Sequence, residues 1–245
     1  FGKSLQEGGG IFLWNSEGDI GAEGEGNHVH DGVATALIHH NSSSGTCVGN
    51  LAVNAPLGHL SNGSKDGMLV RRNEAVGCDQ GYQGIANKVD VTYLENRATL
   101  CRTGFTLFGL GAALHTSEGN VVQGDGSTPS SRGFWWTTAS VFGDSDLNAV
   151  ARNNSLTMCE DGVVLYEDAG SVGYALNADL DGTTGTNLVA GNSVYAIELL
   201  GCDDDVDADG IYFGSLSAAE VESWIQHQPD LGTLGLVSFA GLQPV

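Results

Sequence analysis

Basic residues are scarce in this chain. Nine lysines and arginines stand against 30 aspartates and glutamates over 245 residues, which gives a formal net charge of -21 at pH 7. Phosphate groups are bound by clustered Lys and Arg, so this balance argues against a nucleic-acid partner and equally against anionic membrane surfaces. Dense charge of one sign also repels itself in a compact fold, and we therefore expect cations to stabilise the protein.

Long hydrophobic runs are absent as well. No stretch approaches the roughly 20 apolar residues needed to span a bilayer, so we expect no membrane insertion. The best candidate, 105–114, is short and contains Gly109 and Gly111. The chain begins at Phe1 without a signal peptide, which indicates a mature chain from which a leader was removed. We expect an extracellular or cell-surface location.

The common catalytic motifs are missing. The chain has no Gly-x-Ser-x-Gly and no phosphate-binding loop. The stretch from Glu17 to Glu23 is similar to the paired-carboxylate motif of jelly-roll glycosidases, which needs two acids on one face of a strand. Three residues separate Asp19 from Glu23 where that motif allows one or two, so the faces do not match. We expect that the protein is not an enzyme. The remote alternative is a jelly-roll glycosidase.

The cysteines have no zinc-like spacing and form no Cys-x-x-Cys. In an oxidising compartment, five cysteines predict up to two disulfides and one leftover thiol. We expect Cys159 to pair with Cys202, and two of Cys47, Cys78 and Cys101 to pair with each other.

Glycine and short apolar runs are abundant. The 37 glycines and many short Val, Leu, Thr and Tyr runs between turn residues predict an all-β protein, an antiparallel β-sandwich or jelly roll with one short C-terminal helix. The clearest strand alternates Val89, Val91 and Tyr93 on one face. The dipeptide Glu95-Asn96 is expected to turn the chain back as a hairpin.

One helix is indicated near the C-terminus. Ser217-Ala-Ala-Glu220 is a capping box, with Leu216 and Val221 placed for a hydrophobic staple. The helix is expected to run from about Ser217 to His227.

Alternating oxygen side chains predict calcium sites. Two six-residue stretches, 177–182 and 205–210, carry a carboxylate or amide at every second position and end in Asp-Gly, and 144–148 has the same spacing without the glycine. Neither loop is a complete EF-hand, because position twelve is leucine in both. The alternative is that Asp, Asn and Gly simply form tight turns. The expected Ca²⁺ ligands are Asn177, Asp179, Asp181, Asp205, Asp207, Asp209, Asp144, Asp146 and Asn148.

The segment Ile211-Tyr212-Phe213-Gly214-Ser215-Leu216-Ser217-Ala218-Ala219-Glu220-Val221 resembles the closing strand and short helix of laminin-G-like, concanavalin-like jelly rolls. The resemblance covers about a dozen residues of 245. It implies a two-sheet sandwich, extracellular placement and a calcium-linked glycan or protein contact at one rim. The family's opening strands cannot be placed on residues 1–90, and Asp209 stands where its pattern carries an apolar residue.

Three further groups of residues are candidates for metal binding, glycan contact and glycosylation. His28-Val-His30 places two imidazoles on one face of an extended segment, and it is interpreted either as surface loop histidines or as a transition-metal site. In Phe134-Trp135-Trp136 we expect the outer two rings in the core and Trp135 as the candidate glycan contact. Sequons begin at Asn41, Asn62 and Asn153.

Two functional hypotheses follow. In the first, residues 1–15 form an arm and 16–245 a β-sandwich domain, which could divide near 118–130. The strand Ile11, Phe12, Leu13 and Trp14 is then donated to a neighbouring copy in a calcium-stabilised surface filament or layer, a homopolymer. In the second, the protein is a calcium-dependent glycan-binding or adhesion domain.

Overall fold

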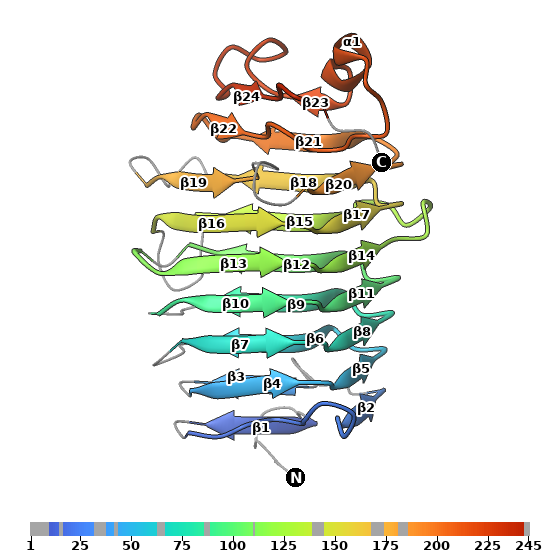
Figure 1. The fold of residues 1–245 in the computed structure, drawn as a ribbon, viewed down its shortest axis with the longest axis vertical. Coiled ribbons are helices and arrows are strands. Elements are labelled where there is room, and N and C mark those ends of the chain that lie inside the picture. Colours follow the sequence, from blue (N-terminus) through green and yellow to red (C-terminus); the bar gives the residue numbers. More distant parts are fainter. Residues whose placement is uncertain are drawn as a thin grey trace.

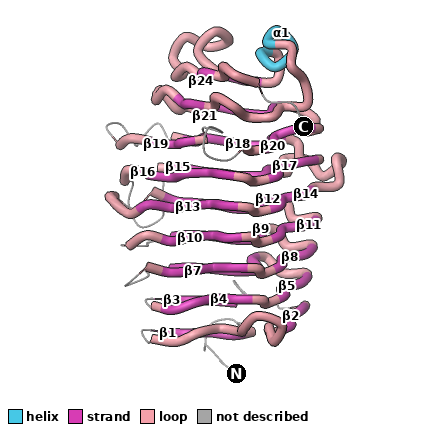
Figure 2. The backbone as a smooth tube through the Cα atoms, viewed as in Figure 1, coloured by secondary structure: helices cyan, strands magenta, loops and turns pink. Residues whose placement is uncertain are grey.

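The computed structural model describes residues 10–14, 17–31, 38–41, 44–62, 67–85, 89–109, 111–138, 145–167, 174–180 and 186–242. Across these ranges the chain winds into a solenoid whose coils stack along one axis, with β1 at one end and α1 at the other (Figure 1). Almost all regular structure is β-strand, and helix appears only in α1 (Ala218–Glu222) within the described ranges (Figure 2).

Three sheets run along the solenoid, and we call them the first, second and third sheet. The first contains, in spatial order, β1 (Ile11–Trp14), β3 (Ile38–Asn41), β6 (Leu57–Asn62), β9 (Gln80–Ile85), β12 (Thr103–Phe108), β15 (Arg132–Thr137), β18 (Asp161–Tyr166), β21 (Tyr195–Leu200) and β23 (Ile225–Gln226). The second contains β24 (Val237–Ser238), β22 (Val206–Asp207), β19 (Leu176–Asp179), β16 (Leu147–Arg152), β13 (Leu114–Glu118), β10 (Val91–Leu94), β7 (Met68–Arg71) and β4 (Gly45–Val48). The third contains β2 (His28–His30), β5 (Leu51–Val53), β8 (Glu74–Val76), β11 (Arg97–Thr99), β14 (Val121–Gln123), β17 (Ser155–Thr157) and β20 (Leu188–Ala190).

Strands that neighbour each other within these sheets are parallel. One coil runs through β6, β7 and β8 before β9 pairs with β6 one coil further on. The antiparallel sandwich predicted from the sequence is therefore wrong, and the fold is a parallel β-helix. Short strands separated by turn residues are common to both architectures. What distinguishes a solenoid is that equivalent residues recur at a fixed offset, so that each coil buries its apolar face on the next.

The dipeptide Glu95-Asn96 shows the difference locally. Glu95 has a φ of 55°, so a left-handed residue does bend the chain there. The bend carries the chain from β10 in the second sheet into β11 in the third, instead of folding it back on β10. The predicted hairpin is thus a corner of the solenoid.

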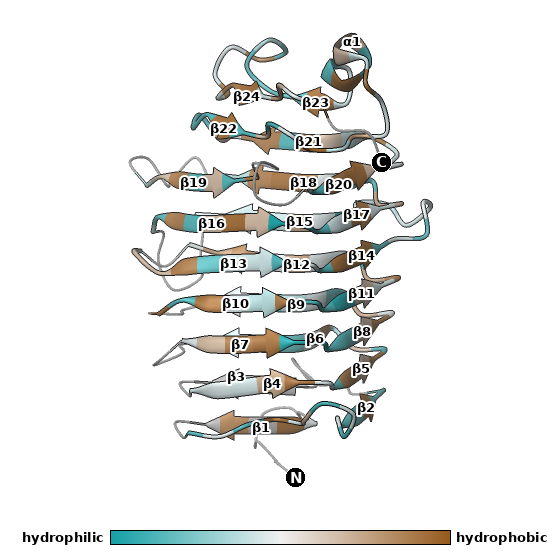
Figure 3. Ribbon diagram, viewed as in Figure 1, coloured by the Kyte–Doolittle hydropathy of each residue, from teal (hydrophilic) through white to brown (hydrophobic). Residues whose placement is uncertain are grey.

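Inward side chains stack from coil to coil. In the first sheet the rings of His59 and Tyr82 stack with centroids 4.7 Å apart, and Tyr82 stacks on Phe105 at 4.4 Å. Phe134 and Trp136 continue these columns and are fully buried, as the sequence predicted. Hydrophobic segments recur in the strands along the whole stack (Figure 3). The core is therefore one continuous column through the solenoid.

The first and third sheets approach closely where glycine replaces a side chain. A Cβ on Gly81 would lie 2.8 Å from the Gly104 carbonyl oxygen and 3.1 Å from the Ala98 Cβ. Such contacts leave no room for a side chain. The glycine column includes Gly58, Gly81, Gly104, Gly133 and Gly162.

Buried asparagines line the corner between the second and third sheets. The side-chain oxygen of Asn73 accepts the backbone N–H of Asn50 at 2.9 Å, and the same contact recurs one coil on between Asn96 and Asn73. The members are Asn50, Asn73, Asn96, Asn120, Asn154 and Asn187. This ladder satisfies backbone groups that the corner would otherwise bury unpaired.

The N-terminal strand is part of the solenoid. β1 pairs in parallel with β3, with Ile11 opposite Ile38. The side chains of Phe12 and Trp14 lie outside the described residues. The interpretation of Ile11–Trp14 as a strand donated to another copy is therefore wrong, because β1 forms the first coil of its own fold. Strands on both sides of residues 118–130 belong to the same three sheets.

The C-terminal helix is shorter than predicted. Ser217 is its N-cap and accepts from the Glu220 N–H at 3.4 Å, but the Glu220 carboxylate binds the Ser215 hydroxyl at 2.6 Å instead of closing the box. Leu216 is exposed, so no staple forms. The chain leaves the helix early because Ile225–Gln226 returns to the first sheet as β23.

The likeness to laminin-G-like jelly rolls is also wrong. Ile211 and Phe213 are buried in the core of the solenoid, in a segment that pairs only through the parallel bridge of Tyr212 with Leu188 in the described structure. α1 lies at the end of the stack, where solenoids need an atypical cap (Figure 1). The described part of the chain contains no helix long and apolar enough to cross a membrane.

Candidate functional site

The acidic loops predicted to bind calcium have another role. The Asp146 carboxylate accepts the Ala175 N–H at 2.9 Å, that of Asp205 accepts Leu236 N–H at 2.8 Å, and that of Asp209 accepts Ala240 N–H at 2.5 Å. Each of these bonds joins one coil to the next. The calcium prediction is therefore wrong for these loops, because the carboxylates cap backbone amides.

The remaining predicted ligands do not converge on a cation either. Asn177 donates to the Asn148 side-chain oxygen at 3.0 Å on the exposed face of the second sheet. Asp207 accepts the N–H of Asp209 at 3.0 Å, as in an ordinary Asx turn. Asp179 lies in β19, opposite Asp207 in β22. Asp144 and Asp181 lie outside the described residues.

The predicted disulfides are absent. All five cysteines are free and buried, including Cys159 and Cys202. Apolar burial raises the pKa of Cys159 to about 11 and that of Cys202 to about 12. These thiols are packing residues of the solenoid interior.

The remaining sequence candidates lie at the surface. The rings of His28 and His30 in β2 are 5.4 Å apart, and His30 Nδ1 is 2.9 Å from an Asp31 carboxylate oxygen. Asp19 accepts the Thr46 N–H at 2.8 Å and Glu23 pairs with Arg72 at 2.9 Å, so these two acids serve separate contacts.

The sequons are also at or near the surface. Asn153 is exposed and Asn62 half-buried. The side chain of Asn41 is not described.

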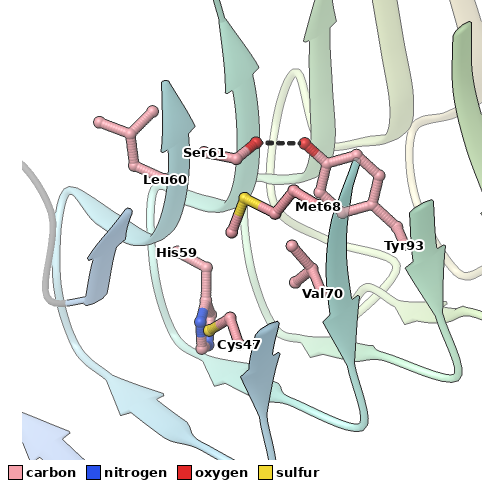
Figure 4. Close-up of a pocket in the computed structure, with 7 residues that line it drawn as sticks. All are labelled: Cys47, His59, Leu60, Ser61, Met68, Val70 and Tyr93. Atoms are coloured by element: carbon pink, nitrogen blue, oxygen red, sulfur yellow. Dashed lines mark hydrogen bonds between the residues drawn. The ribbon is translucent and has the colours of Figure 1, made fainter. Parts of the chain in front are cut away.

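Across the described ranges, no three His, Cys, Asp or Glu side chains come together as a metal site requires. Methionine extends the set of donors. Cys47, His59 and Met68 line one interior pocket of about 10 Å³, together with Leu60, Ser61, Val70 and Tyr93 (Figure 4). A space of this size holds about one water molecule or one ion.

The three candidate donors come from three strands. His59 lies in β6 of the first sheet, whereas Cys47 in β4 and Met68 in β7 belong to neighbouring strands of the second. Figure 4 shows these three side chains among the residues that line the pocket. Ser61 and Tyr93 close one side through a hydrogen bond of 2.6 Å between their hydroxyls.

The tautomer of His59 is set by its surroundings. Its Nε2 lies 3.1 Å from the Glu74 carbonyl oxygen, which can only accept, so Nε2 carries the proton. Its Nδ1 is buried and has no hydrogen-bond partner in the described structure. Burial lowers the pKa of His59 to about 4, so the ring is neutral at pH 7 and Nδ1 keeps a free lone pair.

The sulfur atoms add two soft donors. Cys47 is 3% exposed, and burial raises the pKa of its thiol to about 12. Among the described residues, no carboxylate lines the pocket. Thiolate and thioether sulfur with imidazole nitrogen prefer soft ions, whereas calcium and magnesium require oxygen.

Sequence reasoning missed this trio. The residues are twelve and nine positions apart in the chain, at no known motif spacing, and only the register of the coils brings them together. Val70 opposes Cys47 in the second sheet, with an offset of 23 residues. The available signal was the recurrence of asparagine at this same spacing. Recognising that repeat would have indicated which residues stack on one another in successive coils.

Trp135, the predicted glycan contact, is half-buried on the outward face of the first sheet. It borders a second pocket, of about 150 Å³, whose lining is Gln80, Arg102, Thr103, Thr106, Phe108, Trp135, Thr137 and Tyr166. The alternation read from the sequence thus assigned all three adjacent aromatic rings to the correct faces.

Comparison with known proteins identifies a family. No curated protein and no solved structure matched the chain. The family model described as "Periplasmic copper-binding protein (NosD)" matches residues 2–193, well over half of the chain. That description agrees with the expected location outside the cytoplasm, and it contradicts the calcium filament and the laminin-G-type glycan-binding domain. The chain belongs to the NosD family of periplasmic copper-binding proteins.

Proposed function

We propose that this protein works outside the cytoplasm and binds one copper(I) ion inside its solenoid, between Cys47, His59 and Met68. The observation that carries the proposal is the buried Nδ1 of His59, a lone-pair nitrogen without a hydrogen-bond partner in the described structure, in a pocket that also contains two sulfur side chains. The choice of copper as the metal rests on the description of the family.

The donor set fits copper(I). Cysteine and methionine sulfur favour this ion over harder cations, and imidazole is a common copper ligand. The hydrogen bond from His59 Nε2 to the Glu74 carbonyl fixes the ring, as the partners of metal-bound histidines commonly do. His59 Nδ1, Cys47 Sγ and Met68 Sδ are therefore the atoms that would hold the ion.

The charge of the candidate ligands favours a monovalent ion over a divalent one. With a pKa of about 12, the Cys47 thiol is neutral when no metal is bound, so binding must release its proton. A thiolate and copper(I) together carry no net charge. A divalent ion would leave one positive charge in a pocket whose described lining has no carboxylate, which is costly in an apolar interior. When bound, copper in such a site would be kept away from water and from external ligands.

Anaerobic titration with copper(I) against a chromogenic chelator tests the proposal. Because the three candidate ligands are buried, the metal should be added both to native protein and during refolding. We expect one ion per chain, release of about one proton per ion, and sulfur scattering in X-ray absorption. The variants Cys47→Ser and Met68→Leu should each lower the affinity at least about tenfold.

Matched controls lie in the same chain. Met158 is exposed and Cys159 lies far along the solenoid, so Met158→Leu and Cys159→Ser should leave copper binding unchanged. Failure of wild-type protein to retain copper after both loading routes would contradict the proposal. So would unchanged affinity in the Cys47 and Met68 variants, or loss of copper in His28→Ala/His30→Ala, which would place the metal on the exposed β2 pair.

A further inference from the structure

The second pocket lies on the outward face of the first sheet, away from Cys47, His59 and Met68. The register of the strands explains its position. Phe105 and Phe134 are paired and face the core, so their neighbours Thr106 and Trp135 are paired on the opposite face. The pocket spans β9, β12, β15 and β18, which places it near the middle of the solenoid (Figure 1).

Two aromatic rings form one wall. The Tyr166 ring meets Trp135 edge-on with centroids 6.0 Å apart, and the Arg132 guanidinium lies 4.0 Å from the centre of the Trp135 ring. These contacts hold a half-buried indole in place. A fixed indole presents an apolar surface to the C–H face of a sugar ring, whereas a mobile one would lose entropy on binding.

Apart from Phe108, polar groups form the rest of the lining. Gln80, Thr103, Thr106 and Thr137 bring an amide and three hydroxyls to the pocket. The Trp135 Nε1–H is buried and has no acceptor in the described structure. A few polar groups around an aromatic surface are typical of sites for small polyhydroxylated ligands. The volume of about 150 Å³ is below the roughly 300–1,000 Å³ of drug-sized sites, which suits a single ring.

Two arginines, Arg102 and Arg132, lie at this pocket, and Arg132 is within electrostatic reach of Asp161 and Glu198. Arg102 lies at its rim and is exposed, and its carbonyl accepts the Arg132 N–H at 2.8 Å, so the two arginines occupy adjacent coils. Neither guanidinium forms an ion pair with a described carboxylate, although acidic residues outnumber basic ones 30 to 9. By contrast, Arg71 and Arg72 both pair with Glu23 and Glu95.

The two arginines have different surroundings. Burial raises the pKa of Asp161, one coil beyond Arg132, and Arg132 partly offsets that rise. Arg132 is therefore engaged with Trp135 and Asp161, and it acts as a positioning residue for the indole. Arg102 stands beside Asp79 of the preceding coil, but it forms no ion pair with a described carboxylate, so its guanidinium can meet an anionic ligand.

From this geometry we propose that the pocket binds a carboxylated sugar unit. The pyranose ring stacks on Trp135, the threonines and Gln80 bind its hydroxyls, and Arg102 binds its carboxylate as a two-pronged donor. Polyanions such as nucleic acid are disfavoured by the net charge of -21, which a single carboxylate flanked by hydroxyls tolerates far better.

Titration calorimetry of the full chain tests this proposal with three probes: trigalacturonate, its methyl ester and maltotriose. We expect trigalacturonate to bind at least about tenfold more tightly than the other two. Arg102→Gln should abolish that preference and leave the methyl ester unchanged. Trp135→Ala should weaken all binding, and Trp135→Phe should restore part of it.

Two controls match these variants. Arg152→Gln removes an arginine from outside the pocket, and Tyr174→Ala removes an exposed ring from another sheet edge. Both should bind like wild type. Equal binding of trigalacturonate and its methyl ester would overturn the carboxylate assignment. Absence of saccharide binding at millimolar concentration, or wild-type binding by Trp135→Ala, would overturn the site. Copper binding by these variants is expected to be unchanged, which separates this site from the interior one.

Discussion

The side-chain oxygen of Asn96 accepts two hydrogen bonds from Asn73, one from the backbone N–H at 3.0 Å and one from Nδ2 at 3.1 Å. Both residues are 1% exposed. Asn96 also donates to the Val70 carbonyl at 2.8 Å. A single side-chain amide thus connects its own coil to two points of the preceding coil, at a corner that water does not reach.

Replacing Asn96 with alanine should destabilise the solenoid strongly. The substitution leaves the buried Asn73 N–H unpaired, at a cost of about 1–3 kcal/mol, and it also removes the hydrogen bonds to Asn73 Nδ2 and to the Val70 carbonyl. Urea unfolding followed by circular dichroism should show a clearly lower midpoint. The exposed Asn177→Ala is the control and should unfold close to wild type. A midpoint for Asn96→Ala within error of wild type would show that the ladder is not needed for stability.

The sequence predicted local structure better than the way it assembles. The strand expected at Ile11–Trp14 is β1, and the one expected around Val91 and Tyr93 is β10. The burial of Val91, Tyr93, Phe134 and Trp136 also follows from alternation alone. These properties depend on neighbours in the chain, which a local pattern captures.

Pairing direction depends on distant residues. Val91 lies between Met68 and His115 in register, and no propensity reveals partners that far away. The same limit applies to the interior pocket, since Cys47 and His59 lie in different sheets. The prediction that the acidic loops bind calcium failed for a related reason. Alternating oxygens suit a cation and a coil-to-coil cap equally well, and only the next coil decides which is present.

Removal of divalent cations should not alter stability. The carboxylates of Asp146, Asp205 and Asp209 already accept backbone amides of the next coil. The melting temperature should therefore be the same in EDTA as in millimolar calcium at constant ionic strength. Asp205→Ala should unfold about 1 kcal/mol more easily than wild type because the Leu236 N–H loses its acceptor, and Asp205→Asn should lose less. A melting temperature raised by calcium would contradict this account.

The thiols should be free but slow to react. All five cysteines are unpaired and buried, and burial raises the pKa of Cys47 and Cys202 to about 12. A thiol reagent should therefore titrate five groups only after denaturation, and reductant should not change the melting temperature. Cys78 is expected to react with the reagent faster than the other four thiols, because a hydrogen bond from Cys101 lowers its pKa to about 7. A Cys159–Cys202 peptide in a non-reducing digest would refute this prediction.

Glu167 should make the protein less stable as pH rises through neutrality. Burial raises the pKa of this carboxyl to about 7, and the charges of Asp203 and Asp204 act in the same direction. One carboxyl oxygen, Oε1, is buried without a hydrogen-bond partner in the described structure, whereas the other accepts the Asp203 N–H at 3.3 Å. The folded state therefore holds the proton more tightly than the unfolded state, in which the pKa is near 4.5.

The sign of the effect follows from that difference. The stabilisation from protonated Glu167 is complete below about pH 4.5 and disappears as pH rises through about 7. Glu167→Gln keeps the shape without the titration, so it should melt higher than wild type at pH 8, with the difference shrinking towards pH 5. The other acidic residues titrate alike in both proteins, and their contribution cancels when the melting temperatures are subtracted. Parallel curves for the two proteins between pH 5 and 8 would mean that Glu167 is already ionised at no cost in the folded state.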